Sequence, residues 1–261
     1  MTAPTPLLSE QKAKPKRILN LSGCQLEQLP EKVTKYTYWK IMILDNNRLT
    51  SVPVQLHMRT MKLGYNKFGD NVPPAIVQAL SASVKLRTLD LSSNKLKNFP
   101  GQLNNNRDLE NVNLFDNKLS QIAITSTKFR NIDLGHNEFT APPPIPPNIT
   151  ALGYSYNIVE SLESNFPNIQ NIVSLTLNQC NLKSISESLS CSNLKSIELN
   201  MNNLSTVPDL SRFAPQLERI DLSLNLLKSF PNFPSSIKEI NLSRNELTEI
   251  PQNFRSLTEL A

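Results

Sequence analysis

Residues 86–100 read LRTLDLSSNKLKNFP, with leucine at 86, 89, 91 and 96 and asparagine at 94. Leu89 and Leu91 alternate with polar residues, which predicts a short strand with one buried face, because side chains alternate across a strand. Asn94 follows where the chain must leave the strand, and its amide can both donate to and accept from the backbone of the turn. The stretch therefore predicts one compact unit of strand, turn and return segment, closed by Pro100.

The same pattern recurs along almost the whole chain, at intervals of 19 to 28 residues. An apolar pair precedes each turn, as Met42 and Leu44 precede Asn47. The expected turn positions are Cys24, Asn47, Asn66, Asn94, Asn117, Asn137, Asn157, Cys180, Asn203, Asn225 and Asn245. About eleven units in register indicate a solenoid, in which each unit contacts only its neighbours and one core runs the whole length.

The order L-x-x-L-x-L-x-x-N-x-L resembles that of leucine-rich repeat proteins, and the resemblance covers residues 16–261. It implies an α/β horseshoe with a parallel β-sheet on the concave face. Units of about twenty residues are too short for a full helix after their strand, so the convex segments are expected to be mostly 3₁₀ or extended. The longest unit is the exception, since residues 73–83 (PPAIVQALSAS) predict a short helix entered through proline.

The two ends of the chain depart from the repeat pattern. Residues 1–15 contain three prolines and predict a disordered or loosely packed tail. Residues 16–261 predict about eleven repeats plus the start of a twelfth at Leu257–Leu260. Because a solenoid requires a polar capping unit, this ending favours a portion of a longer protein.

Composition bounds the class of protein. The net charge of +5 is mildly basic and is weak evidence for nucleic acid. Cys24 and Cys180 occupy turn positions and Cys191 a connection, so no disulfide framework is expected. Neither a signal peptide nor an apolar stretch of membrane-spanning length can be read in the sequence. These features together predict a cytoplasmic protein without a membrane span.

Catalysis finds no support in the sequence. The two histidines, His57 and His136, fall in different units, which disfavours both a metal site and a Ser-His-Asp relay. The sequence contains no glycine-rich phosphate loop. We therefore expect no catalytic residue, no metal and no cofactor in this chain, and the acidic side chains of the expected sheet also disfavour nucleic acid.

Side chains that flank the inward leucines should line the concave face, because the repeat pattern leaves them free to vary. One column of this face is mainly basic, and its candidates for partner binding are Arg59, Arg87 and Arg130. The column beside it carries acidic candidates, Asp90 and Asp133, which could instead neutralise the neighbouring arginines. A sheet of eleven strands about 4.8 Å apart is roughly 50 Å long, which suits a protein partner.

Aromatic side chains follow several of the strands, and they complete the candidate contact surface. They are Tyr65, Phe115, His136 and Tyr156. Exposed aromatic residues are typical anchors of protein interfaces, although scattered rim residues are the alternative interpretation.

Two functions fit these features. The first is a non-catalytic protein-interaction module in intracellular signalling. The Leu-Pro or Ile-Pro that closes many repeats resembles the intracellular Ras-suppressor-type subfamily, and this resemblance implies a small GTPase or a phosphatase as the partner. The second is the recognition arm of a larger enzyme, since similar repeats precede 2C-class phosphatase or adenylate cyclase domains. A surface adhesin or receptor ectodomain is a third, disfavoured by the lack of cysteine caps. The oligomeric state is left open by the sequence.

Overall fold

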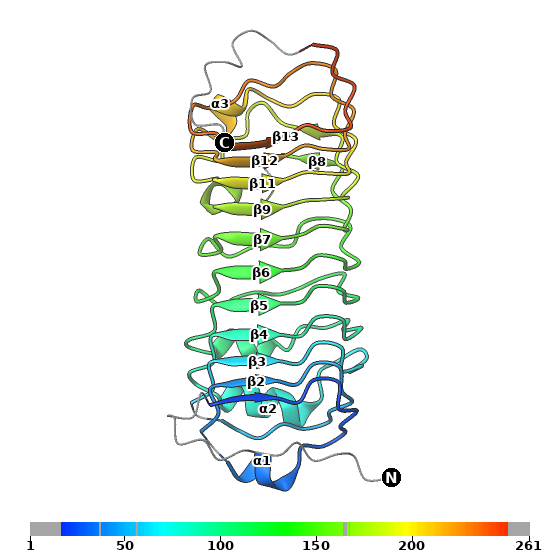
Figure 1. Ribbon diagram of the computed structural model, residues 1–261. Coiled ribbons are helices and arrows are strands. Elements are labelled where there is room, and N and C mark those ends of the chain that lie inside the picture. Colours follow the sequence, from blue (N-terminus) through cyan, green and yellow to red (C-terminus); the bar gives the residue numbers. More distant parts are fainter. Residues whose placement is uncertain (1–16, 37, 56, 164–165, 167, 250–261) are drawn as a thin grey trace.

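The chain winds into a solenoid whose short strands stack one above the next (Figure 1). The computed structural model describes residues 17–36, 38–55, 57–163, 166 and 168–249. The predicted tail at 1–15 and the start of a twelfth repeat at Leu257–Leu260 lie outside these residues.

Eleven strands of the described residues form one parallel sheet, in the order β1-β2-β3-β4-β5-β6-β7-β9-β11-β12-β13. Their bounds are β1 Ile18–Asn20, β2 Ile41–Ile43, β3 Thr60–Lys62, β4 Thr88–Asp90, β5 Asn111–Asn113, β6 Asn131–Asp133, β7 Ala151–Gly153, β9 Ser174–Thr176, β11 Ser196–Glu198, β12 Arg219–Asp221 and β13 Glu239–Asn241. The middle residues are in register, so that Leu89 lies opposite Val112 and Val112 opposite Ile132. The predicted horseshoe with a parallel sheet is confirmed.

The repeats from β1 to β12 each bury two side chains from the strand region, whereas Ile240 and Leu242 of the β13 repeat are partly buried. In β4 the two buried side chains are Leu89 and Leu91, and in β5 they are Val112 and Leu114, and all four belong to one continuous core. Burial of one such side chain contributes about 1.5–3 kcal/mol. The alternation in the sequence thus becomes a stack of apolar layers, one per repeat.

The turn asparagines join neighbouring repeats through a ladder of buried hydrogen bonds. Asn117 donates to the carbonyls of Leu91 and Leu114 at 3.1 and 2.9 Å. Its Oδ1 accepts from the N–H groups of Asn94 and Leu96 at 3.1 and 2.9 Å. One amide therefore satisfies backbone groups of two repeats that the sheet leaves without partners.

One turn position was assigned wrongly from the sequence. The ladder residue of its repeat is Asn202, which donates to Leu177 and Leu199 and is buried. The predicted residue, Asn203, is exposed and donates to Asn181. The error follows from two adjacent asparagines, and only the residue three places beyond Leu199 can reach the ladder.

The residue before each ladder position has a left-handed backbone, with φ between 50° and 70°. These residues are Gly23, Asn46, Tyr65, Ser93, Asp116, His136, Tyr156, Gln179, Met201, Leu224 and Arg244. Such a φ is uncommon for residues other than glycine, asparagine and aspartate. It is stabilised here by bonds to the next repeat, as when the N–H of Tyr156 donates to the carbonyl of Asn178 at 2.9 Å.

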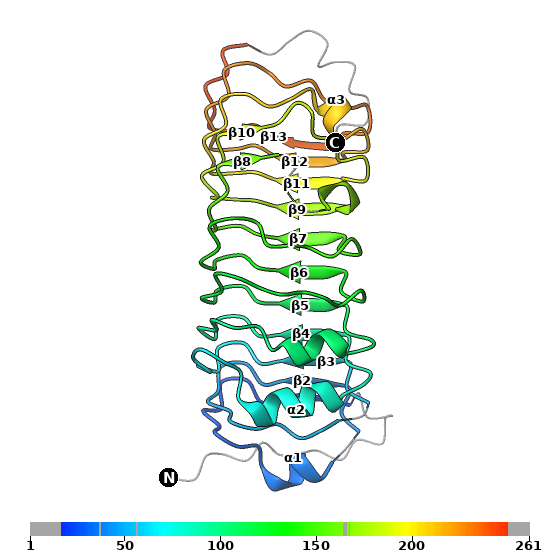
Figure 2. The same ribbon diagram turned by 180° about the vertical axis from the view of Figure 1, so that it is seen from behind.

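The convex side is built from short segments (Figure 2). They are α1 Glu31–Lys35, α2 Pro74–Ala82, η1 Gly101–Asn105, η2 Ile169–Asn171 and α3 Leu210–Phe213, with the η segments in 3₁₀ form. The helix predicted at residues 73–83 is confirmed as α2, with proline in its first turn. A second parallel pair, β8 Ser161–Leu162 with β10 Ser184–Ile185, was not predicted.

Tyr154 takes an inward position that most repeats give to leucine. Its side chain is fully buried, and its hydroxyl donates to the carbonyl of Ala141 at 2.9 Å. A buried hydroxyl needs a polar partner, and this bond supplies one, so a tyrosine fits in the apolar stack.

Candidate functional site

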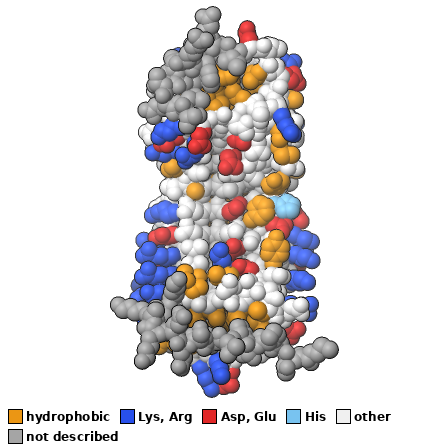
Figure 3. Space-filling view, in the orientation of Figure 1, with side chains coloured by type: hydrophobic (Ala, Val, Ile, Leu, Met, Phe, Trp, Pro, Cys, Tyr) orange, Lys and Arg blue, Asp and Glu red, His pale blue; other side chains and the backbone are white. Residues whose placement is uncertain are grey.

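The concave face has a shallow hollow at its centre, over β4 to β7 and β9 (Figure 3). Its volume is about 470 Å³. Small side chains such as Ala151, Gly153 and Ser174 line one end, and Asp90 and Asp133 line the middle. The hollow is broad and open, as expected for a surface that receives part of another protein.

The acidic side chains of this hollow also hold the ends of their own strands. Oδ1 of Asp90 accepts from the N–H of Ser92, and Oδ1 of Asp133 from the N–H of Gly135, both at 2.9 Å. Asn113 accepts from Phe115 in the same way, so a carboxylate and an amide are interchangeable in this role. One oxygen of each aspartate is therefore structural, whereas the expectation from sequence was that the repeat leaves this position free.

Asp133 occupies space that a glycine leaves open in the next strand. A Cβ at Gly153 would lie 2.6 Å from Oδ1 of Asp133. Burial raises the pKa of the Asp133 carboxyl, and the nearby charge of Asp90 raises it further. Gly153 thus allows a half-buried carboxylate to lie over the floor of the hollow.

The basic candidates divide into free and occupied side chains. Arg59 and Arg87 are exposed, and no ion pair joins Arg87 to Asp90 among the described residues. Arg130 is tied to its own region, because Nη1 donates to the carbonyls of Thr127, Phe129 and Asn148 at 3.1, 3.2 and 3.4 Å. Two of the three arginines therefore remain available to a partner.

The column that contains Arg59, Arg87 and Arg130 continues toward the C-terminus, where its positive charges are neutralised. Nζ of Lys195 and of Lys238 lie 3.1 and 3.2 Å from the carboxylate of Glu218. These two lysines, through hydrogen bonds and charge, hold the pKa of the Glu218 carboxyl below its usual value. The basic character predicted for this column thus belongs to its N-terminal part.

Three of the four predicted aromatic residues form one cluster at the carboxyl ends of their strands. The ring centroids of Phe115 and His136 are 5.8 Å apart, those of Phe115 and Tyr156 6.3 Å, and those of His136 and Tyr156 5.8 Å. Nδ1 of His136 lies 2.8 Å from Oδ1 of Asp116. We call Phe115, His136 and Tyr156 the aromatic cluster. It borders the central hollow, since Asn113 and Asp133 lie two and three residues before Phe115 and His136.

The cluster owes its shape to a second glycine. A Cβ at Gly135 would lie 2.9 Å from Cδ2 of Phe115, so the absence of a side chain at Gly135 leaves room for the Phe115 ring. Tyr156 keeps 45% of its surface exposed. Tyr65 lies two repeats before Phe115 and lines a different hollow.

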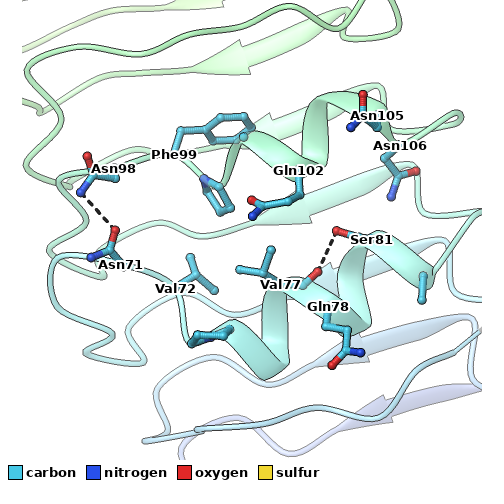
Figure 4. Close-up of a pocket in the computed structure, with 14 residues that line it drawn as sticks. Asn71, Val72, Val77, Gln78, Ser81, Asn98, Phe99, Gln102, Asn105 and Asn106 are labelled. Atoms are coloured by element: carbon cyan, nitrogen blue, oxygen red, sulfur yellow. Dashed lines mark hydrogen bonds between the residues drawn. The ribbon is translucent and has the colours of Figure 1, made fainter.

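A further hollow of about 800 Å³ lies on the convex side, between α2 and η1 (Figure 4). Val77 and Phe99 contribute apolar surface, while Asn71 and Asn98 bond to each other at 3.1 Å. Its lining residues carry no ionisable side chain. The amide and apolar groups that line the hollow cannot act as a general acid, a general base or a nucleophile.

Two features of the described residues bear on other functions. No group of three or more His, Cys, Asp or Glu side chains is placed to hold a metal ion. No helix in this part of the chain has the length and apolar character to cross a membrane. His57 stacks on Tyr38 at 5.8 Å, away from the aromatic cluster.

Comparisons with curated proteins identify relatives with repeats of this kind. The family model described as Leucine Rich Repeat matches residues 85–106 and 236–257. The chain is 25% identical to an adenylate cyclase of Schizosaccharomyces pombe over 250 residues, which cover 90% of this chain and 15% of that protein. It is 29% identical to keratocan of Danio rerio over 207 residues, which cover 74% of this chain and 58% of keratocan. The chain thus spans less than two thirds of either relative.

Solved structures show the same architecture. YopM, a leucine-rich effector protein from Yersinia pestis, aligns with a TM-score of 0.67 and 22% identity, covering 91% of this chain and 64% of YopM. The leucine-rich repeat domain of APL1B aligns with a TM-score of 0.63 and 21% identity, covering 90% and 70%. At these identities the likeness concerns the fold.

Proposed function

The chain is a leucine-rich repeat protein, and from this premise we propose that it binds a protein partner through its concave face. The fold is generally non-catalytic and is typical of protein-interaction modules. The observation that carries the proposal is the aromatic cluster of Phe115, His136 and Tyr156 beside the central hollow.

The cluster has the properties of an interface anchor. Aromatic side chains supply large contact areas with little loss of rotamer freedom, and they dominate the energetics of many interfaces. The half-buried Phe115 ring and the His136 ring both contact the exposed Tyr156 and also contact each other, so the three rings support one another. Arg59, Arg87, Asp90 and Asp133 would supply polar contacts around this anchor.

The partner class that we propose is a small GTPase or a phosphatase subunit, which is what the resemblance to the Ras-suppressor-type subfamily implies. A cytoplasmic location is part of this proposal. The unpaired state of Cys24, Cys180 and Cys191 supports it, because structural disulfides are typical of oxidising compartments.

A crosslinking experiment tests the concave face directly. Photoreactive benzoylphenylalanine would replace Tyr156 in one variant and Gln102, on the convex side, in another. We expect irradiation in the native cell to join the chain to a protein partner from position 156 and much less from position 102. Equal crosslinking from the two positions would contradict a concave interface.

The identified partner then allows a quantitative test. The double substitution Phe115→Ala with Tyr156→Ala should weaken binding by at least about tenfold, since an interface anchor contributes more than about 1 kcal/mol. Tyr38→Ala, which removes another exposed aromatic residue outside the cluster, is the matched control and should bind normally.

A second candidate function is the recognition arm of a larger enzyme. One observation favours it: the alignment with the adenylate cyclase covers 90% of this chain but only 15% of that protein. An antibody against residues 86–140 would measure the mass of the native protein. A mass well above the 29.4 kDa of this chain supports an arm joined to a catalytic domain, for which adenylate cyclase and 2C-class phosphatase are the two hypotheses. A mass near 29.4 kDa would exclude it.

A further inference from the structure

A row of basic side chains runs along the edge of the solenoid where the strands end. The residue directly after the ladder asparagine is basic in four consecutive repeats, namely Arg48, Lys67, Lys95 and Lys118. We call these four residues the basic row. Figure 3 shows Lys and Arg side chains gathered along this edge, beside the N-terminal half of the sheet.

The backbone fixes the spacing of the row. The N–H groups of Arg48 and Lys118 each donate at 2.8 Å to the preceding repeat, to the carbonyls of Leu26 and Leu96. Lys67 and Lys95 have left-handed backbones with φ of 59° and 66°. The Cα atoms therefore follow the strand spacing of about 4.8 Å, so four repeats form a row roughly 15 Å long.

The charges of the row are not neutralised within the described part of the chain. None of the four residues has an ion pair there, and all four are exposed. The nearby Lys97 differs, because its Nζ lies 3.2 Å from Asp70. The positive charges of the basic row therefore have no ion-pair partner among the described residues, although Lys97, two residues after Lys95, has one.

A hollow of about 370 Å³ lies between these side chains. Lys67, Lys95 and Lys118 line it together with Tyr65, whose side chain is 59% exposed. Asp116 also lines it, but this carboxylate already contacts Nδ1 of His136 at 2.8 Å. The hollow thus offers three ammonium groups and one aromatic ring to a ligand.

The net charge of the N-terminal half of the chain adds to the positive potential of the basic row. Residues 17–119 contain 14 Lys and Arg against 8 Asp and Glu, a net charge of +6. Residues 120–249 contain 9 against 12, a net charge of −3. A ligand of negative charge is therefore attracted to the half of the solenoid that carries the basic row.

We propose that the basic row and Tyr65 form a second docking surface, which binds an acidic segment of a polypeptide laid along the edge of the solenoid. A row of 15 Å matches about five residues of extended chain. Nucleic acid fits less well, because the single aromatic ring of Tyr65 offers stacking for only one base. The surface adjoins the aromatic cluster at Asp116 but shares no residue with it, so the proposal does not depend on the function proposed above.

The test uses a fluorescently labelled peptide of alternating glutamate and serine, and the full chain. Fluorescence anisotropy should detect binding at low ionic strength, and the affinity should fall as salt is added, since exposed charges are screened. Charge reversal of three lysines, Lys67→Glu with Lys95→Glu and Lys118→Glu, should reduce the affinity by at least about tenfold.

A matched control separates the effect of the basic row from the effect of the net charge of the chain. Lys32→Glu with Lys85→Glu and Lys128→Glu changes the net charge equally at three exposed lysines elsewhere, and it should lower the affinity by no more than about twofold. Phe115→Ala with Tyr156→Ala should bind the peptide as the unaltered chain does, which separates this surface from the concave interface. Thermal unfolding checks that each variant is folded.

Three results would overturn the proposal. They are no binding of the acidic peptide by the unaltered chain, an equal loss in the two triple variants, and tighter binding of single-stranded oligo-uridine than of the peptide. The last result would identify a nucleic-acid surface.

Discussion

Asparagine occurs both in the ladder inside the turns and in the column on the concave face, but it has a different role in each. Asn117 in the ladder is buried and joins backbone groups of two repeats. Asn113 in the column is half-exposed and holds only the N–H of Phe115, two residues later. A polar group buried between repeats thus determines the stack, whereas one that faces outward can become part of a binding surface.

The largest effect expected from this comparison is that of Asn117→Ala. The substitution leaves the N–H groups of Asn94 and Leu96 without an acceptor. The carbonyls of Leu91 and Leu114 each lose one of two amide donors and keep Asn94 and Asn137 respectively. Buried groups without partners cost about 1–3 kcal/mol, so we expect a loss of at least about 3 kcal/mol in the free energy of unfolding, measured with urea. Asn113→Ala is the control, with an expected loss of about 0.5–1 kcal/mol. Equal losses would contradict the distinction between ladder and column.

The adjacent residues Asn202 and Asn203 give a sharper pair. Asn202→Ala should cost about as much as Asn117→Ala, because Asn202 likewise donates to two carbonyls and accepts from two backbone N–H groups. We expect at least about 3 kcal/mol for Asn202→Ala, against about 0.5 kcal/mol or less for Asn203→Ala, whose amide is exposed. Thermal unfolding of the two variants would measure this difference, and the reverse order would restore the position expected from sequence.

The smallest effect concerns Asp133→Asn and has the opposite sign. The pKa of Asp133 is raised, so the folded protein binds this proton more tightly than the unfolded chain does. Stability therefore falls as the pH rises from the unfolded value of 3.8 through the folded pKa. Asparagine keeps an acceptor for Gly135 and carries no charge, so the variant should gain less than about 1 kcal/mol at neutral pH.

The measurement is the free energy of unfolding across the acidic to neutral range. The curve of Asp133→Asn should be flatter than that of the unaltered chain within this window. Asp221→Asn, at the same position of β12, reports how much follows from losing any carboxylate of the column. Parallel curves for the unaltered chain and Asp133→Asn would show that Asp133 is not destabilised by its burial.

The sequence predicted the fold because the fold repeats. Buried leucines and ladder asparagines recur at intervals that only a solenoid satisfies, and the helix at α2 followed from its prolines and the length of its repeat. The pair of β8 and β10 was missed, because strands of two residues such as Ser161–Leu162 have no periodicity of their own. The turn position was assigned to Asn203 instead of Asn202, because two adjacent asparagines cannot be distinguished by residue type.

The candidate site was harder to predict, since the column position of a residue does not fix what its side chain contacts. Phe115, His136 and Tyr156 were expected together and lie together. Arg130 was a candidate for partner binding or for neutralisation by Asp133, and its guanidinium instead bonds to carbonyls in loops that the repeat pattern does not describe. The basic row was missed although it can be read in the sequence, as a Lys or Arg after four successive turn asparagines.

The left-handed backbone of the residue before each ladder position has a consequence for how the chain folds. A residue such as Tyr156 or Leu224 has a φ that is unfavourable for an isolated turn, by about 1 kcal/mol or more. The compensating N–H bond exists only when the next repeat is in place, as with Leu224 and the carbonyl of Ser243 at 2.9 Å. A single repeat is therefore a poor nucleus. Folding should begin from at least two adjacent repeats and spread outward one repeat at a time, with the rate-limiting step at the first pairing.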